Sequence, residues 1–163
     1  MNNCLHTDLK QRLNQVQERI EKACQSVHRK RDDVNLVVVT KRRSAALIGA
    51  LIPLGVKNIG ENYVQELLDK QASLGEAGNN FSWHLIGTLQ PRKAKYLPHR
   101  IAMIHSIDRL KAAQKLDSVF SEEQLQLPAF LQVNLSGEDT KSGWTLTDGK
   151  LEHQFLSEVE RML

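Results

Sequence analysis

The sequence is poor in cysteine and contains no long apolar run. Its two cysteines, Cys4 and Cys24, form neither a CxxC pair nor a spacing typical of metal ligands, which favours reduced, unpaired thiols. No apolar stretch approaches the roughly 20 residues that a membrane-spanning helix needs. The first ten residues lack the basic and apolar segments of a signal peptide. The sequence therefore predicts a cytoplasmic protein without a membrane anchor.

Aromatic residues and excess charge are also scarce. The net charge is only +3, with 25% charged and 40% hydrophobic residues, which is the balance of a globular chain. Its 163 residues suffice for one domain with a real core, predicted to span 1–163. The basic residues form short separate clusters, and the aromatic residues make no stacking platform for bases. This composition permits an anionic small-molecule ligand and does not predict nucleic-acid binding.

Sequence motifs of several common enzyme classes are missing. No G-x-G-x-x-G follows a predicted strand, and no Walker A, H-E-x-x-H or G-x-S-x-G sequence occurs. Residues 140–142 (TKS) resemble the end of a Walker A motif, but the glycine spacing before them is wrong. The sequence thus carries no fingerprint of a dinucleotide, nucleoside triphosphate, zinc-protease or serine-hydrolase site.

The most informative stretch is 35–41 (NLVVVTK), an apolar run that ends in a lysine. Its β-branched residues without polar alternation predict a strand covered on both faces, as in a parallel sheet. A helical pattern begins near Ser44, so Lys41 should lie at the carboxyl end of the strand, where α/β proteins bind ligands. Lys41 is then either a solvated amine or a nucleophile that condenses with an aldehyde. Position alone favours the first reading. The second needs a lowered pKa of the amine, which partial desolvation and the neighbouring Arg42 and Arg43 would supply.

Helical and strand patterns alternate along the whole chain. Residues 7–28 predict an amphipathic helix that lies against the sheet, with a short coiled coil as the rival reading. Five strand patterns follow, at 35–41, 56–60, 81–87, 101–107 and 128–135. This alternation predicts an α/β fold with a parallel sheet and helices outside it. A doubly wound open sheet and a (β/α) barrel remain as alternatives, and five units would leave the barrel three short of eight.

Helix starts are marked by residues that commonly cap helices. Ser44 is predicted to cap a helix over 45–52, and Asp108 to cap the helix after the fourth strand. Asn62, with Gln65 three positions later, forms a capping-box pattern. The last helix is predicted to begin near Asp148. These positions set the boundaries between the five units.

Several polar or flexible residues within the strands have more than one reading. Gly60, at a strand end, either lets a backbone approach a ligand or serves a tight turn. His84 and His105 lie inside apolar strands, where a hydrogen-bonded core histidine is the first reading and a ligand or acid–base role the second. The basic residues of 91–95 form either a solvated helix face or an anion site.

Four segments occur in a fixed order along the chain. They are 38–41 (VVTK), 60–66 (GENYVQE), 83–93 (WHLIGTLQPRK) and 131–138 (LQVNLSGE), with 105–108 (HSID) between the last two and 141–143 (KSG) after them. Together they resemble the pyridoxal phosphate homeostasis proteins, single-domain relatives of the alanine racemase N-terminal barrel. The resemblance implies a partial TIM (β/α) barrel of the fold-type-III, cofactor-binding kind, with about five βα units after an N-terminal helix.

The resemblance also implies a cofactor and a role. Pyridoxal 5′-phosphate (PLP) would be held as a Schiff base on Lys41, and the protein would bind, buffer and transfer PLP in the cell without turnover, with apo PLP-dependent enzymes as acceptors. Asn62 and His84 match positions around the cofactor in that fold, and Lys141 matches a second family lysine near the rim. A PLP-dependent racemase or decarboxylase and a cofactor-free module that holds an anion at 41–43 remain as alternatives. The oligomeric state stays open.

The resemblance also predicts what these residues lack. The family barrel continues past the fifth unit, and its phosphate-binding serine, glycine and arginine segments lie in that later part. The expectation is therefore a truncated domain over 1–163 that keeps the covalent lysine but lacks the last strands. Such a domain would have two unpaired sheet edges and would be a fragment, or would be completed by another chain.

Overall fold

A five-stranded parallel sheet forms the centre of the computed structural model, which describes residues 2–162, with side chains from residue 7 onward. The strands are β1 (Val37–Val39), β2 (Asn58–Glu61), β3 (Ser82–Leu85), β4 (Met103–Ile107) and β5 (Ala129–Leu131). Each strand pairs with the next one along the chain, in the order β1-β2-β3-β4-β5. A doubly wound sheet would reverse this order at a switch point. The structure therefore confirms the partial (β/α) barrel and excludes the doubly wound alternative.

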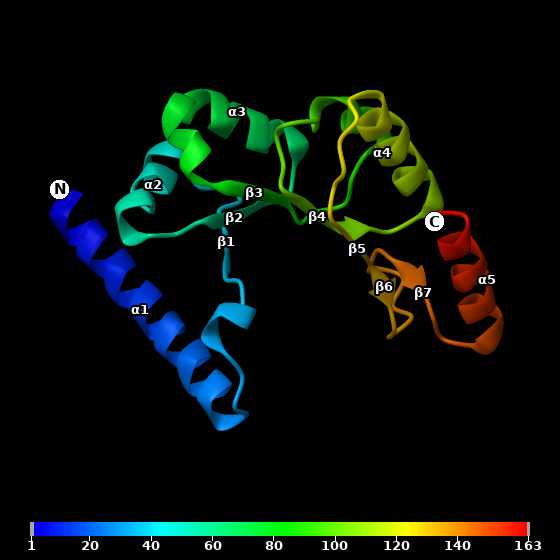
Figure 1. Cartoon of the computed structure of the whole chain (residues 1–163), viewed down its shortest axis with the longest axis horizontal. Helices are drawn as coiled ribbons and strands as arrows, with labels where there is room; N and C mark the ends of the chain where they lie inside the picture. The colour runs from blue at the N-terminus through cyan, green and yellow to red at the C-terminus, as the bar shows by residue number, and fades with distance from the viewer. Residues whose placement is uncertain (1, 163) are drawn as a thin grey trace.

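The connecting helices lie on one side of this sheet. They are α2 (Ala45–Gly49), α3 (Val64–Leu74) and α4 (Leu110–Glu122), with the short 3₁₀ helices η2 (Ile52–Leu54), η3 (Gly75–Asn80) and η4 (Pro91–Tyr96). In Figure 1 α2, α3 and α4 all lie above the strands. The region 75–80 between α3 and β3 is the helix η3. Across residues 2–162, no helix has both the length and the apolar character needed to cross a bilayer.

The core lies between the sheet and these helices. Ile59, Leu85 and Ile104 come from three neighbouring strands and are fully buried. Leu67 of α3 and Leu116 of α4 pack against them in two adjoining clusters. Because successive side chains of a strand point to opposite faces, every second residue of each strand faces the helices. Burying each such side chain stabilises the fold by roughly 1.5–3 kcal/mol.

The other face of the sheet, here called the open face, carries Val39, His84, His105 and Phe130. Val39 is 50% exposed and Phe130 is 56% exposed. The prediction that the valine strand is covered on both faces is therefore wrong. Val38 packs against the helix-side core, but β1 is an edge strand and α2, α3 and α4 all cover the opposite face.

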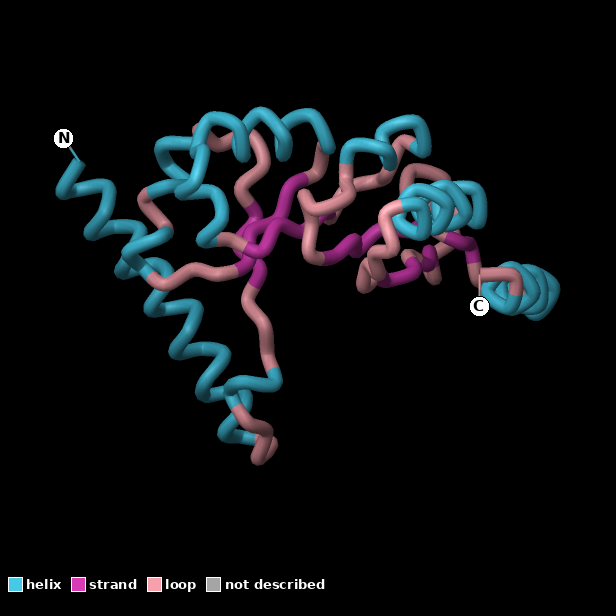
Figure 2. Tube along the Cα trace, turned by 45° about the horizontal axis from the view of Figure 1, so that its top comes forward, coloured by secondary structure: helices cyan, strands magenta, loops and turns pink. Residues whose placement is uncertain are grey.

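The first helix, α1 (Asn2–Ser26), begins and ends earlier than predicted, and the 3₁₀ helix η1 (Arg31–Asp33) connects it to β1. Leu13 packs against the core, and Cys24 is a free, buried cysteine. Val16 and Val27 of the same apolar stripe are 41% and 67% exposed. The expectation that this helix lies against the sheet is wrong for most of its length, because α1 extends away from the strands (Figure 2). The side chain of Cys4 lies outside the described residues.

The predicted strand over 128–135 is divided into β5 and β6 (Val133–Asn134), and β6 pairs in parallel with β7 (Trp144–Thr145). The break occurs at Gln132, where the pairing partner changes. The Gln132 N–H donates to the Ile107 carbonyl of β4 at 2.7 Å, while the Gln132 carbonyl accepts from Trp144 N–H at 2.9 Å. The Trp144 indole donates to Glu158 of α5 (Gly149–Glu160) at 2.9 Å, which attaches the last helix to the small sheet.

The predicted helix caps are partly confirmed. Ser44 caps α2 by accepting a hydrogen bond from the Leu47 N–H at 3.3 Å. The last helix begins where expected, and Asp148 is its cap. The cap roles of Asn62 and Asp108 are wrong. The residues at those caps are Tyr63 and Arg109, with no side-chain cap bond, because each helix begins one residue later. Asp108 instead accepts two hydrogen bonds from the Arg109 guanidinium.

Candidate functional site

Lys41 lies just past the carboxyl end of β1, at the edge of the sheet where (β/α) barrels bind ligands. The preceding Thr40 still belongs to the ladder, since its N–H donates to the Gly60 carbonyl at 3.0 Å. The Thr40 hydroxyl faces the helix side and donates to Glu61 at 2.5 Å. Lys41 and Arg42 then form a turn, which the Arg43 N–H closes by donating to the Thr40 carbonyl at 3.0 Å. The Lys41 side chain is exposed and has no hydrogen-bond or ion-pair partner among residues 7–162.

Asn62 directly follows the carboxyl end of β2. Val39 pairs with Gly60, so the ends of β1 and β2, which Lys41 and Asn62 follow, lie side by side at the same edge of the sheet. Asn62 is half-buried, and its amide has no hydrogen bond to another side chain or backbone group in the described part of the chain. Its backbone is held by Gly87, where an added Cβ would lie 2.3 Å from the Asn62 carbonyl oxygen. A side-chain amide with unused donors and an acceptor thus lies just past the carboxyl end of β2.

His84 of β3 lies on the open face and pairs with Gly60 of β2. It is therefore nearer the amino ends of the strands than Asn62. Its Nδ1 is 2.9 Å from His105 Nε2, and its Nε2 is 3.2 Å from Asn58 Oδ1. With the Asn58 oxygen as acceptor, His84 Nε2 carries the proton and His105 Nε2 donates to His84 Nδ1. Burial lowers the pKa of both histidines, and the proximity of His105 lowers the pKa of His84 further. The pair is therefore neutral at pH 7.

Lys141 lies in the loop between β6 and β7. Its ammonium is paired with the Glu138 carboxylate, which lowers the pKa of Glu138. The adjacent Ser142 hydroxyl is 3.4 Å from Thr88, so this loop touches the segment after β3. Within the described residues no contact joins Lys141 to Lys41. The structure thus places Lys41 and Asn62 just past the carboxyl ends of β1 and β2 and His84 on the open face of β3, and leaves Lys141 on a separate loop.

A buried charged cluster behind Lys41 is a feature that the sequence reasoning missed. The Lys70 ammonium of α3 lies 2.8 Å from the Thr40 carbonyl oxygen, 2.6 Å from Glu61 and 2.7 Å from Glu66. Lys70 is only 6% exposed. The available signal was the spacing of Glu66 and Lys70, four residues apart on a helix. That spacing usually marks an exposed ion pair, so it did not indicate a buried one.

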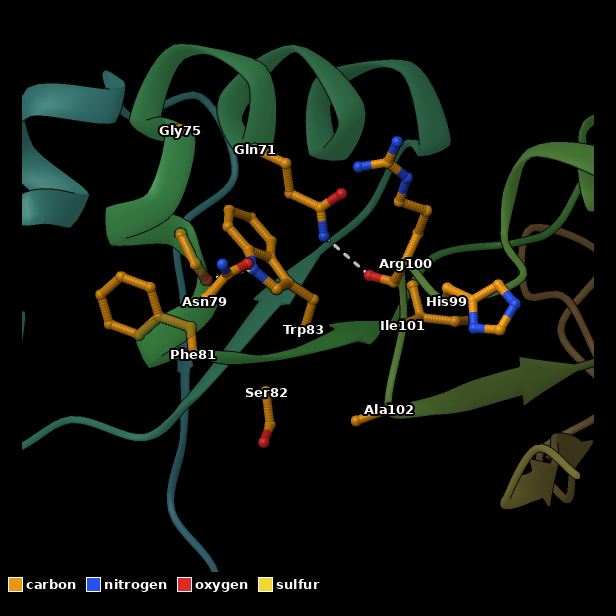
Figure 3. A pocket seen from close by; sticks show the side chains of 11 residues that line it. Gln71, Gly75, Asn79, Phe81, Ser82, Trp83, His99, Arg100, Ile101 and Ala102 are labelled. Carbon is orange, nitrogen blue, oxygen red and sulfur yellow. Dashed lines mark hydrogen bonds between the residues drawn. The ribbon is translucent and has the colours of Figure 1, made fainter. Parts of the chain in front are cut away.

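A cavity of about 380 Å³ lies at the other edge of the sheet, near the amino ends of β3 and β4 (Figure 3). Gln71 crosses it and donates to the Arg100 carbonyl at 2.7 Å. The Trp83 indole in its wall donates to the Gly78 carbonyl at 3.1 Å. Because parallel strands all start at one edge and end at the other, this cavity is not part of the Lys41 site.

The fold and the site define a class of protein. The chain is an α/β protein built on five successive strands of a (β/α) barrel, with a lysine at the carboxyl edge that has no partner among residues 7–162. It is 40% identical over 128 residues to the pyridoxal phosphate homeostasis protein of Pseudomonas aeruginosa, and 34% identical over 142 residues to that of Escherichia coli K12. The chain is therefore a homologue of the pyridoxal phosphate homeostasis proteins, as its sequence motifs predicted.

The matches cover a larger share of this chain than of the two relatives. They cover 78% and 86% of this chain but 55% and 61% of the two relatives. The chain thus spans less than two thirds of the length of the curated relatives it matches. No protein-family model matches the chain.

Solved structures support the fold. PipY of Synechococcus elongatus, without PLP, superposes with a TM-score of 0.71 at 30% identity, covering 88% of this chain and 63% of PipY. PipY with PLP bound gives 0.67 at 33% identity, covering 85% and 63%. A protein of unknown function from Bifidobacterium adolescentis gives 0.80 at 23% identity, covering 99% and 80%, and shows likeness of fold alone.

Proposed function

We propose that this chain binds PLP covalently through the Lys41 amine and takes part in PLP homeostasis in the cell. The observation that carries the proposal is the position of Lys41, exposed past the carboxyl end of β1 without a partner in the described chain. The homology to pyridoxal phosphate homeostasis proteins supports it. PLP supplies an aldehyde carbon with which a primary amine condenses reversibly.

The residues around Lys41 fit such a cofactor. The amide of Asn62, at the neighbouring strand end, would hold a polar substituent of the cofactor through donors and an acceptor that have no partner among residues 7–162. Arg42 and Arg43 follow the lysine directly and are exposed, so positive charge surrounds the place where an anionic cofactor would lie. The neutral His84 would face the cofactor from the open face without adding charge.

The same arrangement favours a carrier over an enzyme. An enzyme that converts amino acids on PLP needs an acid or base placed to move protons at the substrate. The two histidines of the open face, His84 and His105, are hydrogen-bonded to each other, and this occupies the facing nitrogens of both rings. The homeostasis names of the relatives fit a role without turnover. The acceptors proposed here are apo PLP-dependent enzymes, whose own lysine amine displaces Lys41.

The experiment is an intact mass after borohydride reduction, with and without added PLP, followed by peptide mapping. We expect one adduct, located on Lys41, in the wild-type chain and none in Lys41→Ala or Lys41→Arg. Lys57→Ala is the matched control, since Lys57 is also exposed but precedes β2 at the other edge. An unmodified wild-type chain, or adducts spread over other lysines, would refute the proposal. Amino-acid turnover that depends on Lys41 would support the enzyme alternative instead.

Lys141 is assigned a separate part in this proposal. Its ammonium is exposed in the β6–β7 loop beside Glu138, away from direct contact with Lys41. We expect Lys141→Ala to leave PLP attachment at Lys41 unchanged and to slow transfer to an apo enzyme. Equal transfer rates for Lys141→Ala and wild type would remove Lys141 from the proposal.

A further inference from the structure

The buried ammonium of Lys70 lies behind the turn that contains Lys41 and is hydrogen-bonded on all sides. A lysine ammonium has three N–H donors, and the contacts with Thr40, Glu61 and Glu66 use all three. These partners belong to the end of β1, the end of β2 and the first turn of α3. One buried side chain therefore joins three elements at the point where β1 leaves the sheet.

The residue on the other side of Lys41 is held by the same cluster. Arg42 has a φ of +59°, a left-handed conformation that is unfavourable for a residue with a side chain. Its N–H donates to Glu66 at 2.5 Å. The pKa of Glu66 is lowered, chiefly by the hydrogen bond from Lys70 and further by the hydrogen bond from the Arg42 N–H. Glu66 thus stays ionised and holds the strained turn through its carboxylate.

Stability alone is a weak reason for this cluster. Glu61 is fully buried, and its second carboxylate oxygen has no hydrogen-bond partner within residues 7–162. Burying two carboxylates with one ammonium costs desolvation energy that their attraction often only balances. An apolar set of similar size would pack α3 against the sheet without that cost. What the charged set provides in addition is hydrogen bonds to the backbone of Thr40 and Arg42, on either side of Lys41.

We infer that Lys70 is a positioning residue for Lys41. Acting with Glu66, it fixes the backbone at 40–42 from the helix side and so orients the Lys41 amine. The inference rests on the proposed function, because it assigns a purpose to that orientation. Its first readout, however, needs no cofactor.

The first test measures amide hydrogen exchange at Arg42 in the cofactor-free protein. Glu66→Ala removes the acceptor of the Arg42 N–H and should speed this exchange by about tenfold. Lys70→Met removes the ammonium that holds Glu66 and the Thr40 carbonyl, and should speed it as well. Glu66→Gln keeps an acceptor oxygen and should restore most of the protection. Leu67→Ala is the matched control, since Leu67 is fully buried in the same helix and packs in the apolar cluster with Ile48 and Ile59. Glu66 is 25% exposed, so its variants keep the test valid if Lys70→Met does not fold.

The second test measures the chemistry of the Lys41 amine. The rate of its acylation by acetic anhydride, relative to Lys57 in the same sample, and the rate of PLP attachment should both fall by about tenfold in Lys70→Met but not in Leu67→Ala. If both rates and the Arg42 exchange match between Lys70→Met and Leu67→Ala, the positioning role is overturned, even if PLP binds. If Arg42 protection and Lys41 acylation depend on Lys70 while the wild type takes up no PLP, the positioning role stands and the proposed function fails.

Discussion

Replacing Gly87 by alanine should displace the Asn62 segment at the carboxyl end of β2. The added Cβ would lie 2.3 Å from the Asn62 carbonyl oxygen and 2.8 Å from its Cα. Both obstacles are backbone atoms, so the strand end must move by roughly 1 Å to restore an ordinary contact. Overpacking of this kind typically costs about 1–3 kcal/mol, and we expect the upper end because no flexible side chain can yield.

The assay for Gly87→Ala is urea unfolding together with PLP attachment measured after borohydride reduction. We expect a loss of about 3 kcal/mol in the free energy of unfolding and weaker attachment at Lys41. Gly49→Ala is the matched control, since its Cβ would lie 3.6 Å from a Leu74 methyl group. That change, within a helix, should stabilise by about 0.5–1 kcal/mol. Equal stability of Gly87→Ala and wild type would show that the close approach of Gly87 to Asn62 is not real.

Two further predictions concern titration and helix capping. Because the folded state lowers the pKa of His84 and His105, the unfolded chain binds more protons below the ordinary histidine pKa of about 6.5. Stability should therefore fall as the pH is lowered through that value, by at most about 1.4 kcal/mol per pH unit for each imidazole. Urea midpoints across this range should show it, His105→Gln should flatten the dependence, and an unchanged slope in that variant would contradict the assignment. Asp148→Ala removes the acceptor of the Leu151 N–H, 2.9 Å away, and should cost about 1 kcal/mol. The exposed Asp139→Ala is its control, and equal unfolding midpoints for the two variants would remove the cap.

The element order and the parallel sheet followed from periodicity alone, because each strand pattern is short and apolar and each helix pattern is regular. The choice between barrel and doubly wound sheet did not follow. It depends on which strands are neighbours, and pairs such as Val39–Gly60 and Gly60–His84 are long-range contacts that no local pattern records. The prediction that both faces of the valine strand are covered was wrong for a related reason. Val38 and Val39 look alike in sequence, yet only one of them faces the helices.

The site was predictable where chemistry is tied to a strand end and not where it depends on packing. Lys41 was identified from the valine run and its position before a helix. The pairing of His84 with His105 needed the register of β3 with β4 and could not be read from either strand. Lys70 was missed because a glutamate four residues earlier is usually part of a solvated helix face. Lys70 can be buried because it pairs with Glu61 of β2, and only the fold brings these two residues together.

The two tryptophans divide between the two sheets, and this gives the chain a pair of independent optical reporters. Trp83 is 4% exposed and packs edge-on against Phe81 in the main sheet, whereas Trp144 packs against Phe155 beside the small one. Indole fluorescence from Trp144→Phe therefore follows the five-stranded sheet, and that from Trp83→Phe follows β7 and α5. Coincident urea transitions in the two variants would mean that both parts unfold as one cooperative unit.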